Sequence, residues 1–168
     1  YHHKLAAAMA YARANGLNRI VAAAPEAKVG IVSAGKSWQD VLQALANLGL
    51  TDAAAAGVRL LKLGMIWPLD PAIVREFAQG LAAIIVVEEK RPLVEEQLRA
   101  ALYGSADAPR IIGKHVGGTL FDPARGAMAF PNAAEISPGL VAQVLAGTMQ
   151  QAVPGCALAA APVTAKGP

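Results

Sequence analysis

The segment Ala83-Ile84-Ile85-Val86-Val87, followed directly by Glu88-Glu89-Lys90-Arg91, is the most informative stretch of the sequence. Its first five residues are apolar without interruption, and most of them are β-branched. A strand that is apolar at every position has both faces buried, which is typical of a central parallel strand covered by helices on both sides. The segment therefore predicts an α/β protein.

Similar strand-like runs occur on both sides of this segment, and each alternates with a helix-like run. The strands are expected at 29–33, 58–63, 83–87 and 110–112, and the helices at 3–15, 38–48, 71–77, 93–103 and 139–151. Residues 20–25 and 114–135 are expected to be irregular. Successive strand–helix units at short spacing predict a three-layer, open, mostly parallel sheet with helices on both faces.

The ends of the chain differ in character from this middle part. Residues 1–27 are expected to form a helical connection, residues 28–151 the α/β domain, and residues 152–168 a linker to a following domain, because that last stretch has Pro and Gly but no periodic apolar face. Ser37 and Asp70 are predicted to cap the helices that follow them. The whole is typical of a piece of a longer chain.

Composition excludes several classes of protein. The chain has 168 residues, a net charge of +3 and a single cysteine, Cys156. One cysteine cannot anchor an Fe–S cluster or a disulfide framework. No window approaches the roughly 18 apolar residues of a membrane span. Basic residues form no tract, so nucleic-acid binding has little support. With no secretory signal visible, a cytoplasmic location is expected.

One motif suggests a nucleotide-binding enzyme. Gly30-Ile31-Val32-Ser33-Ala34-Gly35-Lys36-Ser37 matches the GxxxxGK[ST] pattern of phosphate-binding loops. However, β-branched Ile31 and Val32 stand where such a loop must curl around phosphate. The preferred register puts 29–33 in a strand and leaves only Ala34-Gly35-Lys36 for the turn, with Gly35 serving the backbone. A phosphate-loop enzyme and a flavodoxin-like module that binds a small molecule remain alternatives.

The turns after the predicted strands provide the candidate functional residues. In an open α/β sheet, the carboxyl ends of the strands form the edge where ligands or partner domains bind. The candidates for this edge, or for an interdomain contact there, are Ser33, Gly35, Lys36, Ser37, Met65, Trp67, Glu88, Glu89, Lys90, Arg91 and Lys114. Trp67 is expected to pack over the end of the sheet. The turn 88–91 is either a solvated turn or a contact with a neighbouring domain, and neither His115 nor Cys156 has a catalytic partner.

Four blocks of this sequence, KVGIVSAGKSWQDVLQALANLGL, VRLLKLGMIWPLDP, AIIVVEEKRPLVEEQL and RIIGKH, resemble the transketolase-C-like domain of indolepyruvate ferredoxin oxidoreductases, in their long fused bacterial form. The similarity covers residues 4–150. It implies a transketolase C-terminal-domain-like fold. It also implies a parent enzyme that oxidatively decarboxylates aryl-2-oxo acids to acyl-CoA, using thiamine diphosphate, Mg²⁺, Fe–S clusters, coenzyme A and ferredoxin.

The resemblance assigns none of these cofactors to the present chain. The segment has no GDG motif for Mg²⁺ and diphosphate and no cysteine cluster. No catalytic, cofactor-binding or metal-binding residue is therefore predicted, and the isolated chain is expected to be inactive. We expect a scaffold or interaction domain whose partners are the other domains of the same polypeptide, with a homodimer as a further expectation.

Overall fold

In a computed structural model, which describes residues 2–114, 128–132, 135–155 and 158, five strands lie side by side in one sheet. The strands are β1 (Asn18–Ala22), β2 (Val29–Ala34), β3 (Val58–Leu63), β4 (Ala83–Val87) and β5 (Arg110–Ile112). Their order is β1–β3–β2–β4–β5, and only β1 is antiparallel to its neighbour. The predicted open, mostly parallel sheet is confirmed.

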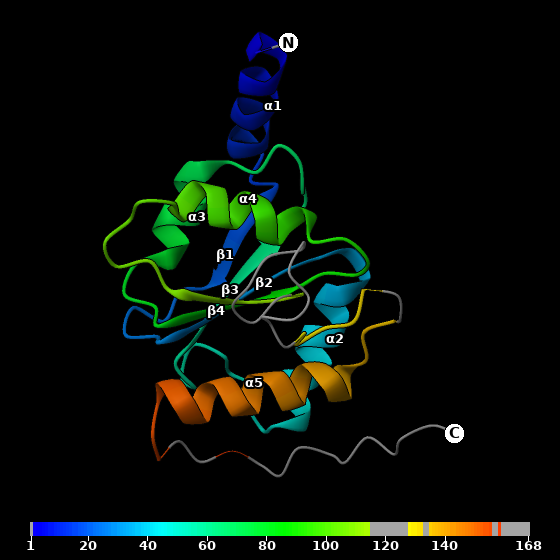
Figure 1. Ribbon diagram of the computed structural model, residues 1–168, viewed down its shortest axis with the longest axis vertical. Coiled ribbons are helices and arrows are strands. Elements are labelled where there is room, and N and C mark those ends of the chain that lie inside the picture. Colours follow the sequence, from blue (N-terminus) through cyan, green and yellow to red (C-terminus); the bar gives the residue numbers. More distant parts are fainter. Residues whose placement is uncertain (1, 115–127, 133–134, 156–157, 159–168) are drawn as a thin grey trace.

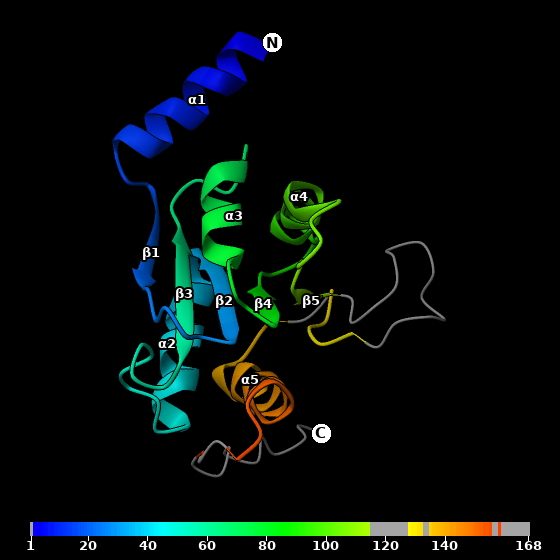
Figure 2. The same ribbon diagram turned by 90° about the vertical axis from the view of Figure 1, so that its left-hand side faces the viewer.

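Helices cover both faces of the sheet, as the sequence predicts (Figures 1 and 2). The helices are α1 (His2–Ala14), α2 (Gly35–Asn47), α3 (Pro71–Ala78), α4 (Leu93–Leu102) and α5 (Pro138–Ala152). Helices α2 and α5 pack on one face and α3 and α4 on the other, while α1 extends away from the sheet (Figure 2). No described helix is both long enough and apolar enough to cross a membrane.

The central position of β4 explains its composition. All five of its residues are buried, and alternate side chains enter the two cores. Ile85 and Val87 join the core beneath α2 and α5, whereas Ile84 and Val86 join the core beneath α3 and α4. The uninterrupted apolar run therefore fills two layers at once.

Strand β1 is a correction to the sequence analysis, which expected residues 20–25 to be irregular. Residues 18–22 form an edge strand that pairs with β3 with one register shift. Its side chains alternate between half-buried and exposed, so it lacks the continuous apolar run that marks β2 and β4. The proposed boundary at residue 28 stays a prediction, although β1 lies in the same sheet as the strands after it.

The predicted helix starts are right in one case and wrong in the other. The Asp70 carboxylate accepts a hydrogen bond from the Ala72 N–H at 3.0 Å and caps α3. Ser37, in contrast, is not a cap: α2 begins at Gly35 directly after β2, so Ser37 lies in the first turn of the helix. Most of the predicted loop 114–135, including His115, lies outside the described residues, as does Cys156.

Candidate functional site at the strand-end edge

The carboxyl ends of β2, β3 and β4 border a cleft of about 640 Å³. The connection from β2 leads to its neighbour on one side, β3, and the connection from β3 then leads across to β4 on the other side. Connections that diverge in this way open a crevice at the strand ends, where α/β proteins bind ligands. The lining residues are Val32, Ser33, Ala34, Gly35, Lys36, Ser37, Leu63, Gly64, Ile66, Val87, Glu88, Glu89, Lys90, Arg91, Leu93 and Val94.

The cleft brings together most of the residues that the sequence placed at this edge. Those that line it are Ser33, Gly35, Lys36, Ser37, Glu88, Glu89, Lys90 and Arg91. Met65, Trp67 and Lys114 are not among its lining residues. The cleft also contains apolar residues that sequence reasoning did not single out, chiefly Ile66 and Leu93.

The β2–α2 junction does not form a phosphate-binding loop. Strand β2 continues to Ala34, so Ile31 and Val32 are paired in the sheet instead of curling around a ligand. The turn takes place at Gly35, which has φ = +55°, a conformation that glycine adopts without a Cβ penalty. The preferred register is confirmed, and Gly35 makes the turn from strand to helix.

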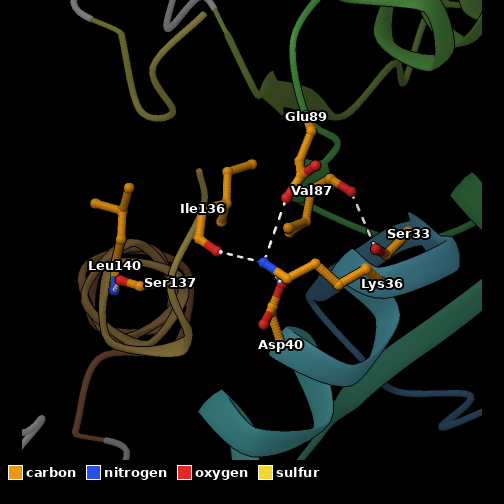
Figure 3. A network of polar contacts seen from close by, with 8 residues as sticks. All are labelled: Ser33, Lys36, Asp40, Val87, Glu89, Ile136, Ser137 and Leu140. Carbon is orange, nitrogen blue, oxygen red and sulfur yellow. Dashed lines mark hydrogen bonds and ion pairs between the residues drawn. The ribbon is translucent and has the colours of Figure 1, made fainter. Parts of the chain in front are cut away.

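Lys36 connects three segments that are far apart in the sequence (Figure 3). Its Nζ lies 3.4 Å from Asp40 Oδ2 on α2, from Glu89 Oε1 after β4 and from the Ile136 carbonyl oxygen before α5. Nearby, the Ser33 hydroxyl donates a hydrogen bond to the Val87 carbonyl at 3.0 Å. These side chains hold the strand ends and α5 together. The sequence placed Ser33, Lys36 and Glu89 at this edge, but not Asp40 or Ile136.

Glu88 fits neither role that the sequence left open for the turn 88–91. Its two carboxylate oxygens accept hydrogen bonds from the Val94 and Glu95 N–H groups, at 2.8 and 2.9 Å. It therefore caps α4, although it lies five residues before the helix begins. Burial raises the pKa of the Glu88 carboxyl above its ordinary value, against the effect of the two N–H groups.

Lys114 points into the protein instead of forming part of an exposed edge. It is 1% exposed, and its Nζ donates to the Pro131 carbonyl at 2.7 Å. Its backbone N–H donates to Glu95 Oε2 at 2.7 Å, and the buried Glu95 also pairs with Arg99 at 2.8 Å. Burial lowers the pKa of Lys114, partly offset by Glu88 and Glu95. Lys114 follows the end of β5 as expected, and its part in an interdomain contact stays a prediction.

The loop after β3 exposes apolar side chains beside the cleft. Ile66 and Trp67 are 42% and 49% exposed, and Leu93, at the start of α4, is 40% exposed. The Gln97 amide donates to the carbonyls of both Ile66 and Leu93 at 2.9 Å, which holds the loop against α4. About half of the Trp67 surface is therefore open to solvent, and its packing over the end of the sheet stays a prediction.

Met65 has a backbone role in the same loop. The Asn18 side chain accepts hydrogen bonds from the Gly64 and Met65 N–H groups and donates to the Met65 carbonyl, at 2.9 to 3.1 Å. Asn18 precedes the rest of β1 and Gln97 lies on α4, so both anchors of this loop come from distant parts of the chain. No local sequence signal could have identified them.

Metal-binding side chains do not gather in the part of the chain that the structure describes. Among the residues that the structure describes, no group of three or more His, Cys, Asp or Glu side chains could hold a metal ion. The whole sequence has one cysteine, whereas Fe–S clusters are held by several thiolates. We therefore derive no chemical step through thiamine diphosphate, Mg²⁺ or an Fe–S cluster on this chain.

Comparisons with known proteins place this geometry in a family context. A family model described as the indolepyruvate oxidoreductase domain matches residues 19–161. The indolepyruvate oxidoreductase subunit IorA of Thermococcus kodakarensis is 39% identical over 89 residues, which are 53% of this chain and 13% of that subunit. The IorA subunit of Methanothermobacter thermautotrophicus is 34% identical over 104 residues, which are 62% of this chain and 16% of that subunit.

The chain thus spans 13% and 16% of the length of these two curated relatives. Among solved structures, a split-gene transketolase described as an inactive beta4 tetramer matches with a TM-score of 0.49 and 20% sequence identity. That match covers 82% of this chain and 42% of the other.

Proposed function

The chain belongs to the indolepyruvate oxidoreductase domain family, and from this premise we propose that it is a non-catalytic interaction domain of a larger 2-oxoacid oxidoreductase. The parent enzyme would decarboxylate aryl-2-oxo acids such as indolepyruvate to acyl-CoA, with ferredoxin as electron acceptor. Thiamine diphosphate, Mg²⁺, coenzyme A and the Fe–S clusters would bind to other domains. A cytoplasmic location and a homodimeric state are part of the same proposal.

The observation that carries the proposal is that charged and apolar side chains have different roles at the strand-end edge. Charged side chains there already serve the fold: Glu88 caps α4, and Lys36 joins α2 to the segments after β4 and before α5. Beside them, Ile66, Trp67 and Leu93 leave large apolar surfaces exposed. Exposed apolar groups gathered beside charged ones are typical of interaction surfaces. We define Ile66, Trp67, Leu93, Lys90 and Arg91 as the rim of the cleft.

The chemistry of the parent reaction supports the assignment of catalysis elsewhere. Decarboxylation of a 2-oxo acid needs an electron sink, which a cofactor supplies and ordinary side chains do not. Transfer of the electrons then needs a redox centre, for which one cysteine is insufficient.

The test uses the full-length parent protein carrying Trp67→Ala and Arg91→Glu together. We expect slower oxidation of indolepyruvate and faster hydrogen exchange at the rim, because a docked neighbouring domain would no longer protect it. The 168-residue chain by itself should give no turnover with indolepyruvate, thiamine diphosphate and an electron acceptor, and the two substitutions should hardly change its unfolding midpoint.

The matched control is Tyr103→Ala, which removes an aromatic side chain that is 92% exposed just after the opposite end of α4. It should leave activity and hydrogen exchange unchanged. Full activity together with unchanged exchange in the rim variant, or an equal loss in the control, would contradict the docking role. Turnover by the isolated chain would contradict the non-catalytic role.

A further inference from the structure

We propose that the cleft binds a small molecule consisting of one phosphate or carboxylate group on an apolar body, with the anionic group at the first turn of α2. This site shares Ile66, Leu93, Lys90 and Arg91 with the rim, but it goes beyond the interaction role because its occupant is a small molecule. Three features of the described residues support it: a hydroxyl in the wall of the cleft without a protein partner, an uncapped helix start, and basic side chains beside apolar walls.

The first feature is the Ser37 hydroxyl. Ser37 is 5% exposed and lines the cleft, and its side chain makes no hydrogen bond with any residue that the structure describes. Its oxygen is not among the fully buried atoms that lack a partner, so the hydroxyl reaches the open space of the cleft. Neighbouring Ser33, in contrast, donates to Val87 at 3.0 Å. An anionic oxygen in the cleft would give Ser37 the acceptor that the fold does not provide.

The second feature is the start of α2, a helix of 13 residues. The residue before it, Ala34, offers no side-chain hydrogen bond to the first turn. The first N–H groups of a helix then remain available, and together with the helix dipole they attract anions. A Cβ at Gly35 would meet no atom within 4 Å, so a ligand can approach the backbone closely at this point.

The third feature is the distribution of charge and apolar surface around the cleft. Glu89 pairs with Lys36, and the Glu88 carboxylate is engaged by the start of α4. Lys90 and Arg91 are exposed and make no ion pair with the described residues. They therefore supply positive charge that an anion could balance. Apolar side chains provide a surface for the remainder of the ligand: Val32, Leu63, Ile66, Val87 and Leu93.

The experiment is a titration of the isotope-labelled 168-residue chain, followed by backbone amide resonances. The probes are phenyl phosphate, phenylacetate and inorganic phosphate, which separate the phosphate and carboxylate groups from the contribution of the apolar body. We expect saturable shifts at residues 35–37 with a dissociation constant near or below about 1 mM for at least one aryl anion. Inorganic phosphate should bind at least several-fold more weakly, because it lacks the apolar part.

Ser37→Ala should raise the dissociation constant about fivefold, the equivalent of one hydrogen bond of about 1 kcal/mol. The charge-matched control for the basic residues is Lys28→Gln, at the opposite end of β2, set against Arg91→Gln in the cleft. Arg91→Gln should weaken binding, whereas Lys28→Gln should not. The absence of saturable shifts at residues 35–37 with all three probes would overturn the proposal. Unchanged affinity in both Ser37→Ala and Arg91→Gln would also overturn it.

Discussion

The two strand-to-helix junctions that border the cleft differ in their length and in how the start of the helix is capped. Strand β2 passes directly into α2, whereas five residues, 88–92, separate β4 from α4. Each junction contains one residue with positive φ: Gly35 at +55° in the first and Lys90 at +60° in the second. In the second, Glu88 folds back and caps the helix; in the first, no side chain does so.

The difference shows what the length of a junction makes possible. A turn of five residues lets a side chain that precedes the helix reach its first N–H groups, so α4 begins with a cap of its own. A direct junction has no residue that can fold back in this way. The start of α2 therefore faces the cleft without a cap. The same edge of the sheet contains one capped helix start, that of α4, and one uncapped helix start, that of α2.

The largest effect is expected for Gly35→Val, which tests whether the direct junction depends on a left-handed residue. A β-branched side chain at φ = +55° should destabilise the chain by about 1–3 kcal/mol, the usual cost of such strain. Urea unfolding measures it. The counterpart at the longer junction is Lys90→Gly, which relieves a left-handed lysine and should be neutral or slightly stabilising. An unchanged midpoint for Gly35→Val would show that the junction tolerates another backbone conformation.

The next effect concerns the cap at the longer junction. Glu88→Ala removes the acceptor of two α4 N–H groups and should lower the free energy of unfolding by about 1–2 kcal/mol, as for other N-caps. The neighbouring Glu89→Ala removes only a half-exposed pair with Lys36 and should cost about 0–1 kcal/mol. Chemical denaturation of both variants checks the order. Equal losses would mean that Glu88 is no more than another surface charge.

The smallest effect concerns how the free energy of unfolding depends on pH. It involves Lys114, whose side chain points into the protein just after β5. Burial lowers the pKa of Lys114 below its ordinary 10.5, so the unfolded chain binds more protons than the folded one between these two values. The free energy of unfolding should therefore gain a rising contribution as the pH increases toward 10.5.

Lys114→Met should remove that contribution, whereas Lys28→Met, which alters an exposed lysine, should leave it in place. Urea unfolding at a series of alkaline pH values measures the slope. A slope that is the same in wild type and Lys114→Met would show that burial does not shift this lysine.

The central part of the fold could be predicted because its signals are local. The run 83–87 is apolar on both faces, and Asp70-Pro71 carries its own start signal, so β4 and α3 lie where expected. The edge strand β1 could not be predicted because its identity depends on pairing with β3, about forty residues later. An alternation of half-buried and exposed side chains in Asn18–Ala22 is too short to distinguish an edge strand from a loop.

At the candidate site, the sequence predicts where residues lie but not which groups they contact. The strand ends could be placed at one edge from the α/β pattern alone, so Lys36 and the turn 88–91 were correctly expected near one another. Whether a charged residue there is solvated, paired or used as a cap depends on which distant groups come within hydrogen-bond distance. For this reason the sequence did not predict that Glu88 caps α4 or that Lys114 donates to the Pro131 carbonyl.

The sequence by itself determined the layered α/β architecture, the strand register at β2 and the glycine turn at Gly35, because uninterrupted apolar runs and left-handed turns have few other solutions. Only the tertiary structure decided which charged side chains at the strand ends form hydrogen bonds or ion pairs within the protein and which face solvent. Hydrogen bonds such as those from α4 to Glu88, and from Lys114 to Pro131, join residues whose proximity exists only after the sheet has formed. The fold leaves the start of α2 without a side-chain cap and the rim beside it exposed.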